Sequence, residues 1–178
     1  MYGTDMPGVM PDEFRKIMAH FATGVAVVTA GQGEDISAAT ISALSSVSLE
    51  PPLFLVCLNR NSRTGQQIVR SRRFGVSILP HGQETLASYF ARKSADKKEA
   101  CQFLEERETC AFVSGAVVQI EAEIEDVVEK RSHIIFFASP LQVWQPDEVG
   151  SHTPLIYYRS AFSSQGREAG RTRADMNC

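Results

Sequence analysis

Residues 40–58 read TISALSSVSLEPPLFLVCL, a stretch that joins a small polar segment to a strongly apolar one. Hydroxyl side chains with little bulk fill its first half: Ser42, Ser45, Ser46 and Ser48. Small side chains leave the backbone accessible to a flat or phosphorylated ligand, but the same composition is also typical of ordinary loops. The sequence therefore leaves two interpretations open here, a ligand-binding crease and a simple connection.

The second half of this stretch, Leu53–Leu58, is an apolar run that predicts a strand buried on both faces. Pro51 and Pro52 fit only at the start of such a strand, because proline lacks the N–H that the sheet ladder requires. Working outward, β-branched and apolar runs predict further strands at 25–30, 36–42, 73–79, 133–144 and 155–158.

Residues 118–125 have the clearest periodicity in the chain, because apolar residues alternate there with acidic or amide residues. This alternation predicts a strand with one buried and one solvent-facing side. We expect the polar residues to point to water and not to act as catalytic carboxylates: Gln119, Glu121, Glu123 and Glu125.

A first helix is predicted after Pro11, where Phe14, Ile17, Met18 and Phe21 recur at helical spacing. Gly24 ends it, and the apolar stripe is typical of a helix packed on a core. Further helices are predicted at 65–70, with Ser62 as N-cap, at 83–92 and at 98–106.

The length of 178 residues fits one domain, which we expect over residues 11–164, with flexible termini at 1–10 and 165–178. A net charge of −3 argues against a general binder of nucleic acid or anionic membrane. The four cysteines have neither C-x-x-C nor zinc-finger spacing, so we expect reduced thiols and no metal site. No signal peptide or apolar run of membrane-spanning length is present, and a cytoplasmic protein is expected.

About seven predicted strands follow one another through turns, without the regular alternation of strand and helix that a doubly wound fold needs. This order favours a mainly β protein with short helices, built as an antiparallel barrel. The GQG turn at 31–33 lacks a third glycine and a following helix, so the dinucleotide-binding fingerprint is absent. Any nicotinamide chemistry here must use another kind of site.

Five segments occur in an order that resembles a known family: FATGVAVVTA (21–30), the block from Thr40 to Thr64, RFGVSIL (73–79), Ser132-His133 and LIYYRSAF (155–162). Over residues 12–163 the chain is similar to short-chain flavin reductases, the reductase components of two-component flavin monooxygenases. The resemblance implies a split β-barrel of the flavin reductase, FMN-binding type. It also implies a homodimer with flavin sites near the subunit interface.

The resemblance, together with the chemistry of the side chains, suggests where a flavin would bind. The polar edge of its ring would meet hydroxyl residues: Thr40, Ser42, Ser45 and Ser46. Val47, beside Leu44, would form part of an apolar wall, for which core packing is the alternative. A helix N-terminus favours anions, so the flavin phosphate would lie at Arg60, Ser62, Arg63 and Thr64. An ordinary capped helix with exposed arginines is the alternative there.

By the same resemblance, His133 would face the nicotinamide or the flavin ring as the catalytic residue, and Tyr158 and Arg159 would border the flavin. A satisfied edge histidine and a surface Tyr-Arg pair are the alternatives. The chain departs from the family pattern in two places. Relatives often have Asn where this chain has Ser42, and Gly-Asp where it has Arg131-Ser132.

The implied activity is an NAD(P)H:flavin oxidoreductase that supplies reduced flavin, FADH2, to a separate monooxygenase for aromatic hydroxylation by diffusible transfer. Hydride transfer needs no acid–base pair, nucleophile or metal, only a nicotinamide held about 3 to 3.5 Å from the flavin ring. The resemblance favours FAD and NADH, and leaves FMN and NADPH open. The alternatives are a flavin-dependent oxidase with its own substrate, a non-catalytic flavin-binding protein and a nucleic-acid-binding barrel.

Overall fold

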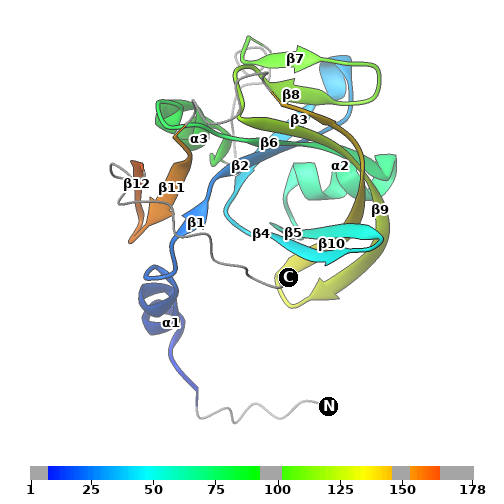
Figure 1. The fold of residues 1–178 in the computed structure, drawn as a ribbon. Coiled ribbons are helices and arrows are strands. Elements are labelled where there is room, and N and C mark those ends of the chain that lie inside the picture. Colours follow the sequence, from blue (N-terminus) through cyan, green and yellow to red (C-terminus); the bar gives the residue numbers. More distant parts are fainter. Residues whose placement is uncertain (1–7, 93–101, 146–152, 165–178) are drawn as a thin grey trace.

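The computed structural model describes residues 8–92, 102–145 and 153–164 of the chain. Within these ranges the protein is mainly β, as the sequence predicts, with short helices outside the sheets (Figure 1). Of the termini predicted to be flexible, 1–10 and 165–178, residues 1–7 and 165–178 lie outside the described residues, as do Cys101 and Cys178.

One antiparallel sheet makes up most of the fold, with the strand order β3-β2-β6-β9-β10-β5-β4. Its members are β2 (Ala26–Ala30), β3 (Ser37–Ile41), β4 (Leu44–Leu49), β5 (Pro52–Asn59), β6 (Arg73–Ile78), β9 (Val118–Lys130) and β10 (His133–Trp144). The two edge strands, β3 and β4, follow each other in the chain through Ser42 and Ala43. The sheet therefore curls into a barrel whose edges meet at this connection, which we call the seam.

Large apolar side chains fill the inside of the barrel. Phe54, Val56, Phe74, Val76 and Phe136 are buried there and belong to one hydrophobic cluster. They alternate along their strands with residues that point outward, which is the period of a strand with one face in the core. On β5, however, the outward row of Leu53, Leu55 and Cys57 is only half-buried. The prediction of a strand buried on both faces is thus correct for one face alone.

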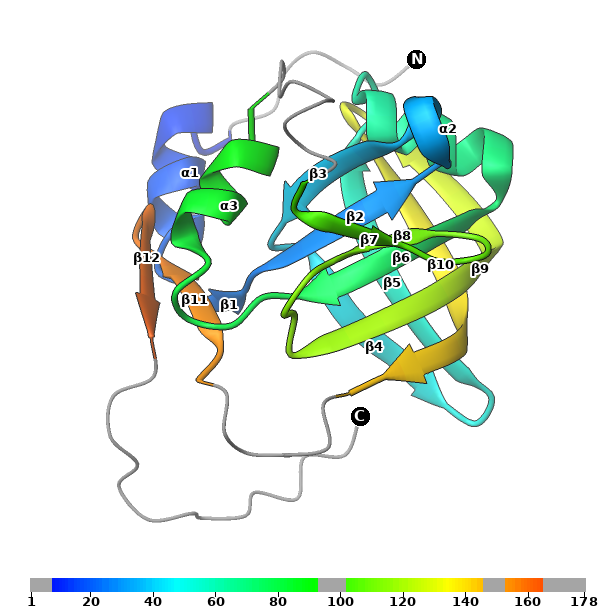
Figure 2. The ribbon, with the colours of Figure 1, turned by 90° about the horizontal axis from the view of Figure 1, so that it is seen from above.

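The helices and two small sheets lie around this barrel (Figure 2). Helix α2 (Arg63–Ser71) begins at the predicted N-cap, where Ser62 Oγ accepts a hydrogen bond from the Gly65 N–H at 3.0 Å. Helix α3 (Glu84–Phe90) covers a second cluster that includes Val25 and Leu155. Strands β1 (Thr23–Gly24), β11 (Leu155–Tyr158) and β12 (Ala161–Ser164) form one small sheet, and β7 (Leu104–Glu106) pairs with β8 (Ala111–Val113) in the other. A short 3-10 turn spans Gly33–Asp35.

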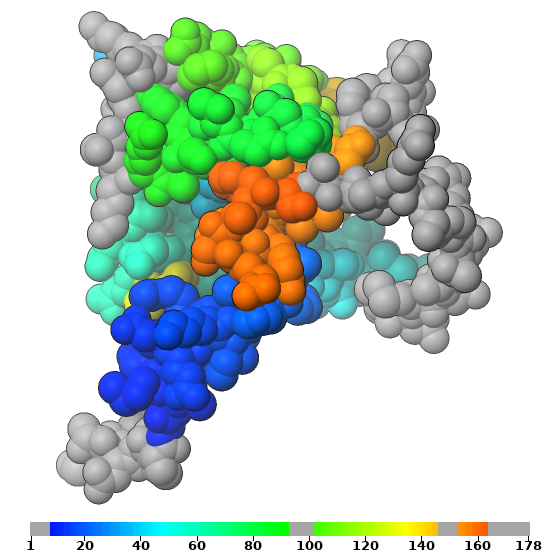
Figure 3. All heavy atoms as spheres, turned by 90° about the vertical axis from the view of Figure 1, so that its left-hand side faces the viewer, coloured from blue at the N-terminus to red at the C-terminus, as the bar shows by residue number. Residues whose placement is uncertain are grey.

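Helix α1 (Pro11–Met18) exists as predicted, but the prediction that its apolar face packs in the core is wrong. None of its residues is buried, and Phe14 and Ile17 remain 57% and 53% exposed. The reason is its position, because α1 projects from the barrel next to the β11–β12 hairpin and has no sheet behind it (Figure 3). The chain therefore exposes an amphipathic helix.

Two further predictions are wrong because of the β7–β8 hairpin. The described part of the predicted helix at 98–106 contains strand β7, while residues 98–101 lie outside the described ranges. Gln119 and Glu121 are each only 6% exposed, although alternation placed them in water. Thr109, in the turn of this hairpin, donates a hydrogen bond to Glu121, and Arg107 donates one to Gln119. Glu123 and Glu125, farther along β9, are exposed as expected.

Among the described residues, no helix is long and apolar enough to cross a lipid bilayer.

Candidate functional site

A cleft of about 490 Å³ lies at the seam of the barrel. One wall comes from the seam, with Ile41, Ser42, Ala43, Leu44 and Ser45. The rest of the lining comes from Leu55, Ile78 and the segment that leads into β2: Phe21, Ala22, Thr23, Gly24, Val25 and Ala26. A mostly apolar cleft of this size with a few polar groups matches the usual anatomy of a small-molecule site.

The polar groups of the cleft are hydroxyls. Ser42 and Ser45 lie in its wall, as the sequence predicts, and Ser45 Oγ donates a hydrogen bond to the Ser46 carbonyl at 3.1 Å. Thr23, which was not predicted, also lines the cleft, and its Oγ1 is buried without a hydrogen-bond partner among the described residues. A buried hydroxyl without a partner costs free energy, so a ligand acceptor in the cleft would stabilise it.

Three of the predicted ring contacts lie outside the cleft lining. The Thr40 hydroxyl donates to the Ala87 carbonyl at 2.7 Å, which holds β3 against α3. Ser46 and Val47 follow Ser45 on the edge strand β4, where the register shifts between Ser46 and Ser48. This irregularity leaves Val47 42% exposed. Contacts of these three residues with a ligand remain predictions.

The predicted phosphate contacts lie at the N-terminus of α2. Arg60 and Arg63 are exposed there, whereas Thr64 is buried and Ser62 Oγ is already used by the helix cap. The Ser62 side chain lies close to the backbone of Gly65 at this end, because a Cβ added to Gly65 would be 2.8 Å from Ser62 Oγ. The exposed N-terminal end of α2 can therefore offer two guanidinium groups and helical N–H groups to an anion.

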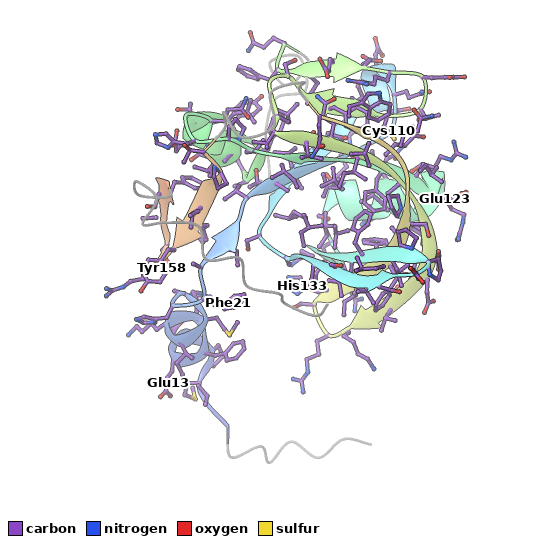
Figure 4. The ribbon with its side chains drawn as sticks, in the orientation of Figure 1. Glu13, Phe21, Cys110, Glu123, His133 and Tyr158 are labelled. Atoms are coloured by element: carbon purple, nitrogen blue, oxygen red, sulfur yellow. The ribbon has the colours of Figure 1, made fainter. Side chains whose placement is uncertain are left out.

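His133 opens β10, where it lies opposite Asn59 of β5 on one side and Lys130 of β9 on the other. Its side chain is exposed, and Nδ1 lies 2.9 Å from the Ser132 Oγ (Figure 4). Asn59 is four residues beyond Leu55 of the cleft, which corresponds to roughly 13 Å along an antiparallel strand. His133 and the α2 N-terminus thus share one end of β5, away from the cleft by this distance.

Tyr158 and Arg159 lie at the turn of the β11–β12 hairpin, where Arg159 and Ser160 both have positive φ angles of 49° and 64°. The Arg159 N–H donates to the Ala19 carbonyl at 2.7 Å, and the Tyr158 ring contacts His20 edge-on. β11 also pairs with β1, so the hairpin supports the cleft wall that contains Thr23. Neither residue lines the cleft, and their predicted contact with a flavin remains a prediction.

Two cysteine thiols among the described residues have a raised pKa. Burial raises the pKa of the Cys57 thiol on β5, and burial raises that of Cys110 to about 11. Both thiols are therefore poor nucleophiles. Among the described residues, no group of three or more His, Cys, Asp or Glu side chains is placed to hold a metal ion. The arrangement can bind and orient a planar ligand, whose own chemistry must then supply the reaction.

Comparison with known proteins gives consistent results. Residues 18–166 match the flavin reductase like domain family. The reductase component of a 4-nitrophenol 4-monooxygenase/4-nitrocatechol 2-monooxygenase from Rhodococcus opacus is 36% identical over 84% of this chain and 78% of that protein. An NADH-dependent FMN reductase from Streptomyces nodosus subsp. asukaensis is 34% identical over 85% of this chain and 83% of that protein. The solved structure of an NADH:FAD oxidoreductase from Streptomyces globisporus, in complex with NAD and FAD fragments, has a TM-score of 0.81 at 27% identity and covers 93% of this chain and 100% of its own.

Proposed function

Because the chain belongs to the flavin reductase like family, we propose that the cleft at the seam binds the isoalloxazine ring of a flavin beside a reduced nicotinamide. The family, the split-barrel fold class and the enzyme class expected from the sequence are confirmed. The chain is an NAD(P)H-dependent flavin reductase that supplies reduced flavin to a partner monooxygenase.

The observation that carries the site assignment is the composition of the cleft. Among the described residues, the side chains of its lining are apolar apart from three hydroxyl residues, Ser42, Ser45 and Thr23. An isoalloxazine ring has an apolar edge and an edge of hydrogen-bonding groups, and this lining suits both. The Thr23 hydroxyl, which is buried without a described partner, fits a carbonyl of the ring as its acceptor.

The phosphate of the flavin is assigned to the N-terminus of α2. Arg60 and Arg63 are exposed at this end, and the positive end of the helix favours an anion. The separation of roughly 13 Å between Leu55 and Asn59 along β5 leaves room for the ribityl chain between the two binding points.

The bound flavin supplies the hydride acceptor, and the protein has to exclude water and hold the two rings face to face. The apolar side chains of Phe21, Leu44 and Leu55 line the cleft and would cover a bound ring against water. The resemblance implies that His133 faces the nicotinamide or the flavin ring, and this contact remains a prediction, because His133 lies at the α2 end of β5, roughly 13 Å along the strand from Leu55 of the cleft. Hydride transfer itself requires no proton transfer by the protein.

We assign the exposed face of α1 to a second copy of the chain. Phe14, Ile17 and Met18 form an apolar stripe that the described part of the chain leaves exposed, and Phe21 extends it to the cleft with 70% of its surface exposed. An exposed apolar patch of this kind is typical of a protein–protein interface. A homodimer formed through α1 would bring the partner to the mouth of the cleft, consistent with flavin sites near the interface.

Transfer of reduced flavin by diffusion requires that the cleft release its ligand. A dissociation constant in the micromolar range, about −8 kcal/mol, would hold the flavin and still let it leave. The cleft offers few polar contacts to a ligand, which fits this affinity, because three hydroxyl residues are the polar side chains in its described lining. We propose a cytoplasmic reaction, since reduced nicotinamide is available there, and an aromatic substrate for the partner, by analogy with the nitrophenol system.

The activity is tested by measuring oxidation of NADH and of NADPH with FAD, with FMN and without added flavin. The expected result is nucleotide oxidation that depends on added flavin, with free reduced flavin trapped by a separate oxygenase. Oxidation that added flavin does not accelerate would overturn the proposal. Turnover that consumes an organic substrate without releasing reduced flavin would instead identify an oxidase.

A further inference from the structure

Four exposed cationic side chains gather at one end of β5 and form what we call the cationic cluster: Arg60, Arg63, Lys130 and Arg131. Arg60 and Arg63 belong to the segment that enters α2, whereas Lys130 is the last residue of β9 and Arg131 begins the turn to β10. These segments are about 70 residues apart in the sequence and meet only because β5 pairs with β10.

Two hydrogen bonds attach the turn to the α2 segment. The Arg60 N–H donates to the Ser132 carbonyl at 2.9 Å, and the Arg60 guanidinium donates to the Arg131 carbonyl at 3.4 Å. Lys130 and Asn59 both lie opposite His133, one on each side of it. The positions of the turn cations relative to α2 are therefore set by the sheet and not by a free loop.

None of the four side chains has an acidic partner within 4.0 Å in the part of the chain that the structure describes. Other arginines of the protein do, because Arg15, Arg73 and Arg107 each pair with a carboxylate. Glu129, the acidic residue next to the turn, pairs with Ile134 and so lies on the opposite face of the hairpin from Lys130 and His133. The cationic cluster thus keeps its charge uncompensated in a chain whose net charge is −3.

Uncompensated like charges at close range repel each other, and an anion that binds among them removes this cost. A single phosphate at the α2 N-terminus is matched by Arg60 and Arg63 alone. Lys130 and Arg131 add two more cations from the other side, which suits the second phosphate of a diphosphate. A carboxylate of a small molecule or of a protein would need neither four cations nor a fixed distance between these cations and a cleft that binds a ring.

We propose that the cationic cluster binds the diphosphate of a dinucleotide, with Lys130 and Arg131 as the residues that distinguish dinucleotides from mononucleotides. This inference rests on the proposed function, because it uses the same cleft and the same α2 N-terminus. Two substrates of the reaction contain a diphosphate, FAD and NADH. Their mononucleotide counterparts, FMN and reduced nicotinamide mononucleotide, contain a single phosphate. The experiment separates them by using both pairs.

The variants are Arg131→Gly, Lys130→Ala and the double variant. Arg131 has a positive φ of 53°, a conformation that glycine adopts without strain, so the first variant removes the charge without disturbing the turn. Arg70→Ala is the matched control, because Arg70 is an exposed cation in the last turn of α2, at the opposite end of the helix from the cluster. Steady-state KM is measured for FAD and FMN at saturating NADH, and for NADH and reduced nicotinamide mononucleotide at saturating FMN.

The expected result is a rise of about fivefold in KM for the dinucleotide in each single variant, and more in the double variant, with a smaller change for its mononucleotide. The rise for FAD alone assigns the flavin diphosphate, and the rise for NADH alone assigns the nicotinamide diphosphate. Added salt should lower the difference between wild type and variants.

Equal changes for dinucleotide and mononucleotide would overturn the inference, because they would mean a general electrostatic effect. Unchanged KM values, with a loss only of coupling to an acidic partner protein, would overturn it in favour of a docking surface. Failure of the proposed function is distinguishable, since wild-type protein would then oxidise no nicotinamide with any flavin.

Discussion

The Thr23→Val variant tests the assignment of the cleft as the flavin site, because it should raise the stability of the free protein and lower its affinity for flavin. In the free protein Thr23 Oγ1 is buried without a partner among the described residues. An unsatisfied buried hydroxyl costs about 1 to 3 kcal/mol, and valine has the same shape without this cost. Valine is also favoured in strands such as β1. We expect the free energy of unfolding of the flavin-free protein to rise by about 1 kcal/mol.

Flavin binding should weaken in the same variant. If the hydroxyl donates to a ring carbonyl in the complex, its loss removes a hydrogen bond of about 1 kcal/mol, which is about fivefold in Kd. Urea unfolding without flavin measures the first quantity, and fluorescence titration with FAD or FMN measures the second. Each measurement needs only the purified protein.

Thr29→Val is the matched control, because the buried Thr29 hydroxyl on β2 lies outside the cleft lining and has a partner in the free protein, the Ala111 carbonyl. Its loss leaves that carbonyl without this donor, so the free energy of unfolding should fall by about 1 kcal/mol while the flavin Kd stays within about twofold. A Thr23→Val protein that is less stable than wild type and binds flavin equally well would refute the reasoning. The hydroxyl would then have a structural partner in the fold.

Two further predictions concern the exposed helix and the buried thiol. Ile17→Lys places a charge on the apolar face of α1, where Ile17 is 53% exposed, and should convert a dimer to a folded monomer, measured by sedimentation equilibrium. Lys16→Ala, on the opposite face of the helix, is the control and should leave the mass of the dimer unchanged. A wild-type protein that is itself a monomer would contradict the assignment of this face. Cys110 has a pKa raised by burial to about 11, so its thiol ionises more easily in the unfolded chain, and its contribution to stability, present below about pH 9, is lost between about pH 9 and 11. Cys110→Ala should therefore have a smaller fall in the free energy of unfolding over this pH range than wild type, measured by urea titration, and equal falls would show that Cys110 is not the group responsible.

The sequence predicts the central strands well because each has a strong local pattern. The run at 53–58 and the alternation at 118–125 both become strands, and Ser62 caps α2 as expected. β4 is missed because its serines lack an apolar alternation, and it forms a strand only by pairing with β5. The burial of Glu121 could not be predicted, since it depends on Thr109 of a hairpin that local patterns assign to a helix.

The candidate site is predicted in part, for a similar reason. Ser42 and Ser45 are found from their own segment, whereas Phe21 and Thr23 lie about 20 residues earlier and reach the cleft through the pairing of β1 with β11. Both lie inside the segment FATGVAVVTA, so the family resemblance marks their region without assigning a role. The exposure of α1 could not be predicted from the spacing of its apolar residues either, because an apolar stripe does not show whether the same chain or a second copy covers it.

The central claim, that the cleft at the seam holds the flavin ring, is tested most directly by a crystal structure of the protein with FAD or FMN. We expect density for the ring in the cleft, in contact with Ser42, Ser45 and Thr23, with its phosphate toward Arg63. Density for the ring at another place on the protein, with the walls of the cleft packed together, would contradict the account.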